Sequence, residues 1–227
     1  MKILAVIHAR GGSKRIPLKN LALLRGKPLV AYPILLAKKS RFINRIVLST
    51  DHDGIMIAGE KYGAQVPFRR PKPISEDVPS ELVTLHAVNF LKKTETYTPD
   101  IVVTLTPATP FTSVADLDAG IALLIKNKRW DSVVTVRKAG EHPEWILWKN
   151  ADGSFKTVLG NSLDGKYNVS QNLRAAFYPS GAFYINRTRS LLRTKSLYGK
   201  KYGAVMLDTK RNIDIDEPDD LKKARSR

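Results

Sequence analysis

Seven glycine, hydroxyl and cationic residues stand close together directly after the first apolar run of the chain. They are Arg10, Gly11, Gly12, Ser13, Lys14, Arg15 and Lys19. Glycines let a backbone approach a phosphate closely and adopt left-handed conformations. Arginine and lysine neutralise the phosphate oxygens during phosphoryl or nucleotidyl transfer. The spacing matches neither the P-loop nor the dinucleotide-binding fingerprint. We expect a phosphate-binding loop, and the alternative is a solvated glycine turn with surface cations.

An acidic pair, Asp214 and Asp216, lies near the end of the sequence. We expect a strand over residues 213–216, and residues i and i+2 of a strand point to the same face. Two adjacent carboxylates suit Mg²⁺, which keeps several waters and also binds phosphate oxygens. The spacing therefore predicts a magnesium site. The alternative is that Asp216 caps the final helix, at whose positive end Glu217 also stands.

Short apolar runs rich in β-branched residues alternate with helical patterns from residue 1 to about 137. Strands are expected at residues 2–8, 45–50, 65–68, 100–106 and 132–137, and helices at 28–39, 54–62, 81–93 and 114–126. This alternation is typical of an α/β fold with a doubly wound, mostly parallel sheet. Ligands of such sheets bind beyond the carboxyl ends of the strands, where the polar motifs lie.

The alternation breaks near residue 142. A hairpin is predicted around the turn Asn150-Ala151-Asp152-Gly153, and the stretch after it is polar and irregular. Later elements are expected as strands at 181–186, 205–208 and 213–216 and helices at 188–194 and 218–224. We therefore predict one domain over residues 1–227, from which a small β-rich lobe at about 140–176 leaves the main sheet.

The composition limits the possible classes of protein. The 227 residues include no cysteine, which excludes disulfides, thiolate zinc sites and cysteine nucleophiles and fits the cytoplasm. The apolar run at residues 3–7 is too short for a signal peptide or a membrane span. Lysine and arginine number 38 against 21 acidic residues, a formal charge of +17, which indicates an anionic partner. Because no nucleic-acid-binding motif accompanies this charge, we expect no nucleic-acid and no membrane partner.

The pattern Ala9-Arg10-x-x-Ser13-Lys14-x-x-Pro17-x-Lys19-Asn20 resembles that of the CMP-sugar synthetases, the cytidylyltransferases of acidic sugars. Further segments follow in the family's order over nearly the whole chain: Ser49-Thr50-Asp51, Arg70-Pro71 with Asp77, the residues 104–110, Glu141-His142-Pro143, the residues 178–185 and the residues 213–216. The resemblance implies a Rossmann-like nucleotidyltransferase fold whose lobe contacts the partner in a homodimer. It also implies Mg²⁺-dependent transfer of CMP from CTP to the anomeric hydroxyl of an acidic nine-carbon 2-keto sugar, with release of pyrophosphate.

The resemblance also gives roles to single residues. Arg10 and Lys19 would bracket the triphosphate, and a water or Asp216 would take the proton, a choice that stays open. The implied nucleotide contacts are Ala9, Arg10, Gly11, Gly12, Ser13, Lys19, Asn20, Arg70, Asp77, Ser80 and Thr106, and the implied sugar contacts are Thr106, Gln171, Arg174, Tyr178 and Ser180. From the residues alone, Arg70 could equally be a surface cation, and Ser80 could be the N-cap of the helix that follows it.

The segments that would contact the sugar depart from the family pattern. Thr106 stands where the family has glutamine, and Tyr178-Pro179-Ser180-Gly181 replaces Arg-Pro-Asn-Gly. Arg174 lies four positions after the place of a missing arginine and could supply the cation for a sugar carboxylate. The acceptor, of the neuraminic, legionaminic or pseudaminic type, therefore stays open. The rival functions are another nucleotidyltransferase, acting on a sugar phosphate or polyol phosphate, and a non-catalytic anion- or RNA-binding domain.

Overall fold

The computed structural model describes residues 1–208 and 213–226. The chain divides into two compact units. The first joins Met1–Thr135 to Ser180–Arg227, and the second is Val136–Pro179. The lobe expected at about 140–176 lies within the second unit.

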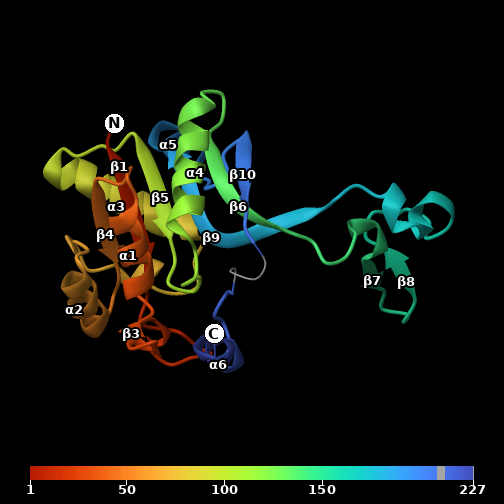
Figure 1. Cartoon of the computed structure of the whole chain (residues 1–227), viewed down its shortest axis with the longest axis horizontal. Helices are drawn as coiled ribbons and strands as arrows, with labels where there is room; N and C mark the ends of the chain where they lie inside the picture. The colour runs from red at the N-terminus through yellow and green to blue at the C-terminus, as the bar shows by residue number, and fades with distance from the viewer. Residues whose placement is uncertain (209–212, 227) are drawn as a thin grey trace. The chain divides into compact units, whose positions relative to one another are not determined.

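Six strands form the main sheet in the order β10-β6-β9-β5-β1-β4 (Figure 1). Their bounds are β1 Ile3–His8, β4 Arg45–Ser49, β5 Ile101–Leu105, β6 Ser132–Lys138, β9 Phe177–Arg187 and β10 Tyr202–Met206. The central strand β1 pairs in parallel with β4 on one side and β5 on the other, whereas β9 runs antiparallel to β5. The predicted α/β fold with a mostly parallel sheet is confirmed.

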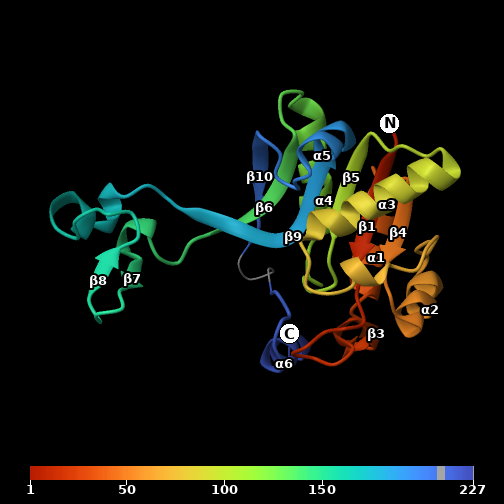
Figure 2. The ribbon, with the colours of Figure 1, turned by 180° about the vertical axis from the view of Figure 1, so that it is seen from behind.

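Helices cover both faces of this sheet. They are α1 Ala31–Lys39, α2 Asp53–Tyr62, α3 Ser80–Glu95, α4 Val114–Lys126 and α5 Thr188–Thr194, whereas α6 Pro218–Arg225 packs against residues 16–29 after β1. On β1, Ile7 packs in one apolar cluster with residues of α1, α2 and α4, while Val6 packs in a second cluster with α3. Figures 1 and 2 show α1 and α3 against opposite faces. Burial on both faces explains why the strand is apolar at nearly every position.

Three local expectations were wrong. Residues 65–68 make only one isolated bridge, Val47 to Gln65, because Pro67 has no N–H to donate to a ladder. Residues 213–216 form no strand, since Ile215 packs in an apolar cluster with α6 and the first loops rather than in the sheet. Ser80 is the first residue of α3 and not its cap, because Pro79 takes the N-cap position.

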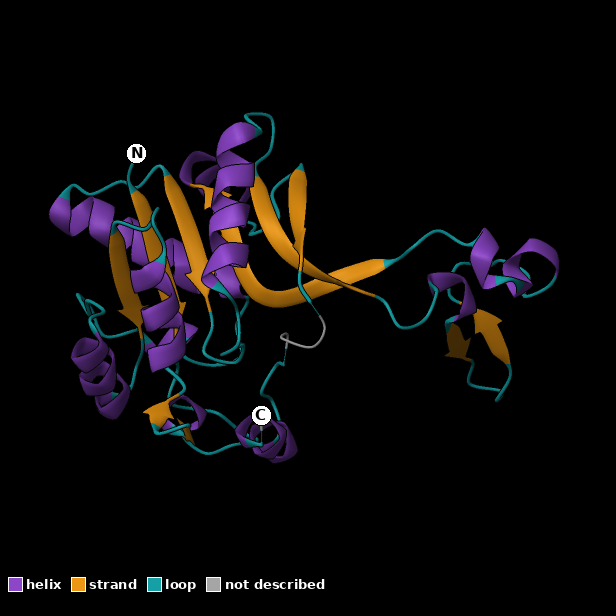
Figure 3. Ribbon diagram, in the orientation of Figure 1, coloured by secondary structure: helices purple, strands orange, loops and turns teal. Residues whose placement is uncertain are grey.

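The second unit contains the predicted hairpin. Its strands are β7 Leu147–Lys149 and β8 Phe155–Thr157, and they pair antiparallel (Figure 3). The turn closes with a hydrogen bond from the Asn150 N–H to the Ser154 carbonyl, and Gly153 adopts the left-handed φ of 85° that the turn requires. The first unit also holds a short ribbon of β2 Leu23–Leu24 and β3 Lys27–Pro28. Among the described residues, no helix is long and apolar enough to cross a membrane.

Candidate active site

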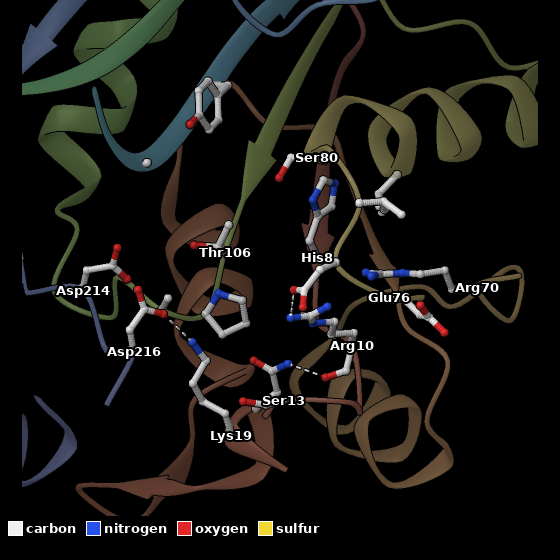
Figure 4. A pocket seen from close by; sticks show the side chains of 18 residues that line it. His8, Arg10, Ser13, Lys19, Arg70, Glu76, Ser80, Thr106, Asp214 and Asp216 are labelled. Carbon is white, nitrogen blue, oxygen red and sulfur yellow. Dashed lines mark hydrogen bonds and ion pairs between the residues drawn. The ribbon is translucent and has the colours of Figure 1, made fainter. Parts of the chain in front are cut away.

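A cavity of about 420 Å³ lies beyond the carboxyl ends of β1 and β5, entirely within the first unit (Figure 4). Its lining includes many of the residues predicted from the sequence: Arg10, Ser13, Lys19, Asn20, Arg70, Asp77, Ser80, Thr106, Asp214 and Asp216. Segments far apart in the chain therefore meet at the edge of the sheet where ligands of parallel sheets bind.

The loop after β1 is held by polar contacts to its neighbours. The Gly11 N–H donates to Asp51 Oδ1 at 2.8 Å, and the Asn20 side-chain amide donates to the Arg10 carbonyl oxygen at 2.8 Å. Neither Gly11 nor Gly12 has a positive φ, so the expected left-handed glycines are absent from the loop. Leu18 instead takes the left-handed conformation, with φ 48°. Ala9 is fully buried, and its N–H donates to the Ser49 carbonyl oxygen.

Asp77 binds the cations of the loop. Its carboxylate pairs with Arg10 and, at 3.0 Å, with the ammonium group of Lys14. Hydrogen bonds from Lys14 and Arg10 lower the pKa of Asp77 below its ordinary value. Asp77 thus balances two charges that a phosphate would also attract, and its predicted contact with the nucleotide stays a prediction.

Lys19 connects the loop to the acidic pair. Its Nζ donates to the Ile215 carbonyl oxygen at 2.8 Å and to Asp216 Oδ1 at 3.0 Å. The Ile215 N–H in turn donates to the Ala108 carbonyl oxygen at 2.8 Å, just beyond β5, and the Ile215 side chain is fully buried. These bonds fix the segment against the cavity without a strand.

The alternative role for Asp216 as a helix cap is wrong. Glu217 is the N-cap of α6 and forms a capping box with Asp220. Asp214 and Asp216 both line the cavity, although they lie outside the strand from which the spacing argument placed them together. The described residues contain no group of three or more His, Asp or Glu side chains that could hold a metal by themselves. Two carboxylates that line a cavity of about 420 Å³ fit Mg²⁺, whose other ligands would be waters and substrate phosphates.

Arg70 is an interior residue, only 5% exposed, so its interpretation as a surface cation is wrong. Its Nε donates to Ser49 Oγ at 3.0 Å, and its guanidinium also donates to the Ser49 carbonyl oxygen. Burial lowers the pKa of Arg70 to about 10, against the opposing effect of Asp51. The group stays charged at neutral pH and holds its planar fork at the wall of the cavity.

His8 is a cavity residue to which the sequence reasoning assigned no role. Its Nε2 lies 3.1 Å from Thr84 Oγ1, which lies 2.9 Å from Thr104 Oγ1, so a polar chain runs behind the cavity wall. Burial and the charge of Arg70 lower the pKa of His8 to about 3. The position of His8 at the carboxyl end of β1 was the signal that could have identified it.

The predicted sugar contacts are divided between the two units. Thr106 lines the cavity, and Ser180 is 7% exposed, with no hydrogen-bond partner for its hydroxyl among the described residues. Gln171, Arg174 and Tyr178 belong to the second unit, where the Arg137 guanidinium lies 4.4 Å from the centre of the Tyr178 ring. The contact of these three with a sugar stays a prediction.

Comparisons with known proteins find relatives along nearly the whole chain. Residues 4–225 match the family model described as cytidylyltransferase. The chain is 32% identical to a CMP-N,N'-diacetyllegionaminic acid synthase of Legionella pneumophila, over 97% of this chain and 93% of that protein. It is 30% identical to a pseudaminic acid cytidylyltransferase of Campylobacter jejuni, over 99% and 95% of the two chains.

A solved structure shares the fold. It is a CMP:2-keto-3-deoxy-manno-octonic acid synthetase in complex with CTP, with a TM-score of 0.71 at 16% identity over 100% of this chain and 98% of that one. At this identity the likeness concerns the fold alone. The match of the family model over nearly the full length shows that this chain belongs to the cytidylyltransferase family.

Proposed function

We propose that the protein transfers CMP from CTP to the anomeric hydroxyl of an acidic nine-carbon 2-keto sugar. The observation that carries this proposal is the meeting of Arg10, Lys19 and the Asp214–Asp216 pair in one cavity beyond the parallel strands. The two relatives of about 30% identity are named for the activation of such sugars with CMP, which supports the choice of substrates.

The reaction needs little covalent chemistry from the protein. The sugar hydroxyl oxygen forms a bond to the α-phosphorus of CTP, the bond from that phosphorus to the pyrophosphate oxygen breaks, and the hydroxyl proton leaves to a water or to Asp216. Arg10 and Lys19 would neutralise the charge that builds on the phosphate oxygens. Lys19 is well placed for this role, because its ammonium group is held by Ile215 and Asp216.

We also propose Mg²⁺ as the cofactor, held by Asp214 and Asp216 together with phosphate oxygens of the nucleotide. The ion would supply additional positive charge to the triphosphate. Arg70 would contact the cytosine side of the nucleotide with its fixed fork, as the family resemblance implies. Both carboxylates belong to residues 214–216, whose position depends on the hydrogen bonds of Ile215.

A homodimer in the cytoplasm completes the proposal. The hairpin unit leaves large apolar side chains uncovered, with Trp148 60% and Phe155 61% exposed. Uncovered aromatic side chains are typical of protein–protein contacts and support association through this unit. The absence of cysteine supports a reducing compartment.

The decisive experiment measures pyrophosphate release from CTP, ATP, GTP and UTP, each with Mg²⁺ and a panel of acceptors. The panel holds N-acetylneuraminic, legionaminic and pseudaminic acids, an eight-carbon 2-keto acid and several sugar and polyol phosphates. We expect release with CTP and at least one nine-carbon acid. Release only with a phosphorylated acceptor would support the rival nucleotidyltransferase. No release with CTP and every nine-carbon acid would overturn the proposal.

A further inference from the structure

A second cavity, of about 310 Å³, is strongly cationic. Its lining includes Lys128, Arg129, Arg187, Arg189 and Arg193, with Asp131 as its acidic residue. The residues come from the α4–β6 connection, the end of β9 and the helix α5. Figure 1 shows α5 and this connection at the end of the sheet where β1 begins, whereas the candidate active site lies beyond the carboxyl ends of the strands.

The carboxylate of Asp131 is already occupied. It accepts hydrogen bonds from Ser190 Oγ at 2.6 Å and from the Lys200 and Lys201 backbone N–H groups at 2.9 and 3.2 Å, and it pairs with Arg193 at 3.3 Å. Asp131 therefore joins α5 to the segment before β10. Its charge also acts on Arg187, whose pKa it raises, but one negative charge cannot balance the five cations of the cavity.

Within the described residues, only Arg193 of the five cations forms an ion pair. The side chains of Lys128, Arg129 and Arg189 are exposed, and none forms an ion pair in the part of the chain that the structure describes. Burial and the nearby charge of Arg189 lower the pKa of Arg187, whose guanidinium donates to the carbonyl oxygens of Trp130 and Leu124. Arg187 is thus a fixed charge at the base of the cavity, and Arg189 lies close enough to repel it.

The sequence around the cavity adds further positive charge. Residues 187–201 contain six lysines and arginines and no acidic residue, and Lys128 and Arg129 add two more cations from the other side. Like charges gathered around a concave surface raise the local concentration of anions. The guanidinium group of arginine donates two parallel hydrogen bonds to two oxygens of one phosphate. This geometry favours phosphate over a halide ion.

We propose that this cavity is a second anion site, which binds a small molecule with two or more linked phosphate groups. The class includes pyrophosphate, tripolyphosphate and the nucleoside di- and triphosphates. A single phosphate would leave several of the cations unbalanced, and the limited volume favours a small molecule over a nucleic-acid strand. The proposal does not depend on the proposed reaction, because it concerns other residues at the opposite edge of the sheet.

The test is calorimetric titration of the full chain with inorganic tripolyphosphate at fixed ionic strength. We expect two sites per chain for the unaltered protein and one for the double variant Arg10→Ala/Lys19→Ala. In that background, Arg129→Ala/Arg189→Ala should weaken the remaining site at least about tenfold, because two charge-assisted contacts are lost. The control Lys149→Ala/Lys156→Ala removes the same charge from the hairpin unit and should change the affinity less than about twofold, by screening alone.

Several outcomes would overturn the proposal. These are the absence of any tripolyphosphate site that Arg129→Ala/Arg189→Ala weakens, an equal effect of the two charge-matched variants, or tighter binding of single-stranded RNA at this cavity than of tripolyphosphate. If the Arg10→Ala/Lys19→Ala variant does not fold, the number of sites answers the question alone, because Arg129→Ala/Arg189→Ala should reduce it from two to one. Turnover of the Arg129→Ala/Arg189→Ala variant without added anion should equal that of the unaltered protein.

Discussion

The side-chain amide of Asn20 donates a 2.8 Å hydrogen bond to the backbone carbonyl oxygen of Arg10 and thereby closes the loop after β1 into a ring. Asn20 is only 5% exposed, and its own carbonyl oxygen accepts a hydrogen bond from the Val30 N–H. An interior residue, rather than a glycine, therefore sets the position of the Arg10 backbone at the cavity.

Replacing Asn20 by alanine should displace the loop and also lower the stability of the fold. Loss of one hydrogen bond from a buried amide costs about 1–3 kcal/mol of the free energy of unfolding. We expect kcat/KM for CTP to fall about tenfold or more, since misplaced binding groups lose transition-state stabilisation. Denaturant unfolding and steady-state kinetics measure the two effects. An unchanged kcat/KM with reduced stability would show that the bond is structural only.

The two loop glycines should differ sharply in their tolerance of alanine. A Cβ at Gly11 would lie 2.9 Å from the Cβ of His52, whereas one at Gly12 would meet no atom within 4 Å. We expect Gly11→Ala to displace the loop, break the Gly11 N–H bond to Asp51 and lower kcat/KM for CTP at least about tenfold. Gly12→Ala is the matched comparison for packing and should leave the free energy of unfolding near its unaltered value, whereas Gly11→Ala should lower it. Equal stability of the two variants would contradict the packing seen at His52.

Lys19→Met should lower kcat on the order of 10²–10³-fold, because it removes a fixed positive charge from the developing transition state. Methionine is unbranched and one atom shorter than lysine, so most of the packing is retained. Lys222→Met is the control, since Lys222 forms an exposed ion pair with Asp219 on α6. Rapid-quench measurement of CMP transfer separates the chemical step from product release. A loss confined to KM would place Lys19 in uniform binding of the substrate instead.

Asp214→Asn and Asp216→Asn should each raise the Mg²⁺ concentration for half-maximal turnover by about tenfold or more. Mn²⁺ binding followed by electron paramagnetic resonance gives a readout that is independent of turnover. Asp219→Asn changes the charge equally on the nearby helix α6 and should leave both quantities unchanged. If all three variants behave alike, the acidic pair is not a metal site.

His8 should make stability depend on pH. Its pKa is about 3 in the folded protein against 6.5 as an ordinary value, so the unfolded state binds more protons between these two values. The stability contributed by neutral His8 is complete above about pH 6.5 and is lost as the pH falls toward 3. Near pH 5, the His8→Gln variant should take up about one proton fewer on unfolding than the unaltered protein does. The slope of unfolding free energy against pH measures this uptake, and identical slopes would contradict the low pKa.

The sequence predicted most of the sheet because buried parallel strands leave a strong pattern. Every residue from Ile3 to Ile7 is almost fully buried, and each of these positions of β1 is apolar. The strand expected at residues 65–68 does not form because Pro67 interrupts the apolar run and cannot donate a ladder hydrogen bond. The error at residues 213–216 came from a buried isoleucine between two polar residues, a pattern that a loop residue in an apolar cluster also produces.

The candidate site was harder to predict because its residues depend on contacts made far along the chain. Nothing in the sequence around Arg70 shows that its guanidinium is buried against Ser49. The role of Asp77 as partner of two loop cations is equally invisible before the chain is folded. His8 was missed because a histidine before Ala-Arg has no distinguishing spacing, and only the polar chain to Thr84 shows how it is held.

The ion pair between Lys19 and Asp216 joins residues that are 197 positions apart in the chain. Ribosomes add roughly 5–20 residues per second, so Lys19 is synthesised roughly 10–40 s before its partner. The nascent chain during that interval carries the loop cations but neither carboxylate of the acidic pair. The two halves of the proposed site are therefore synthesised at opposite ends of translation, and the ion pair that joins them can form only when the last segment has been made.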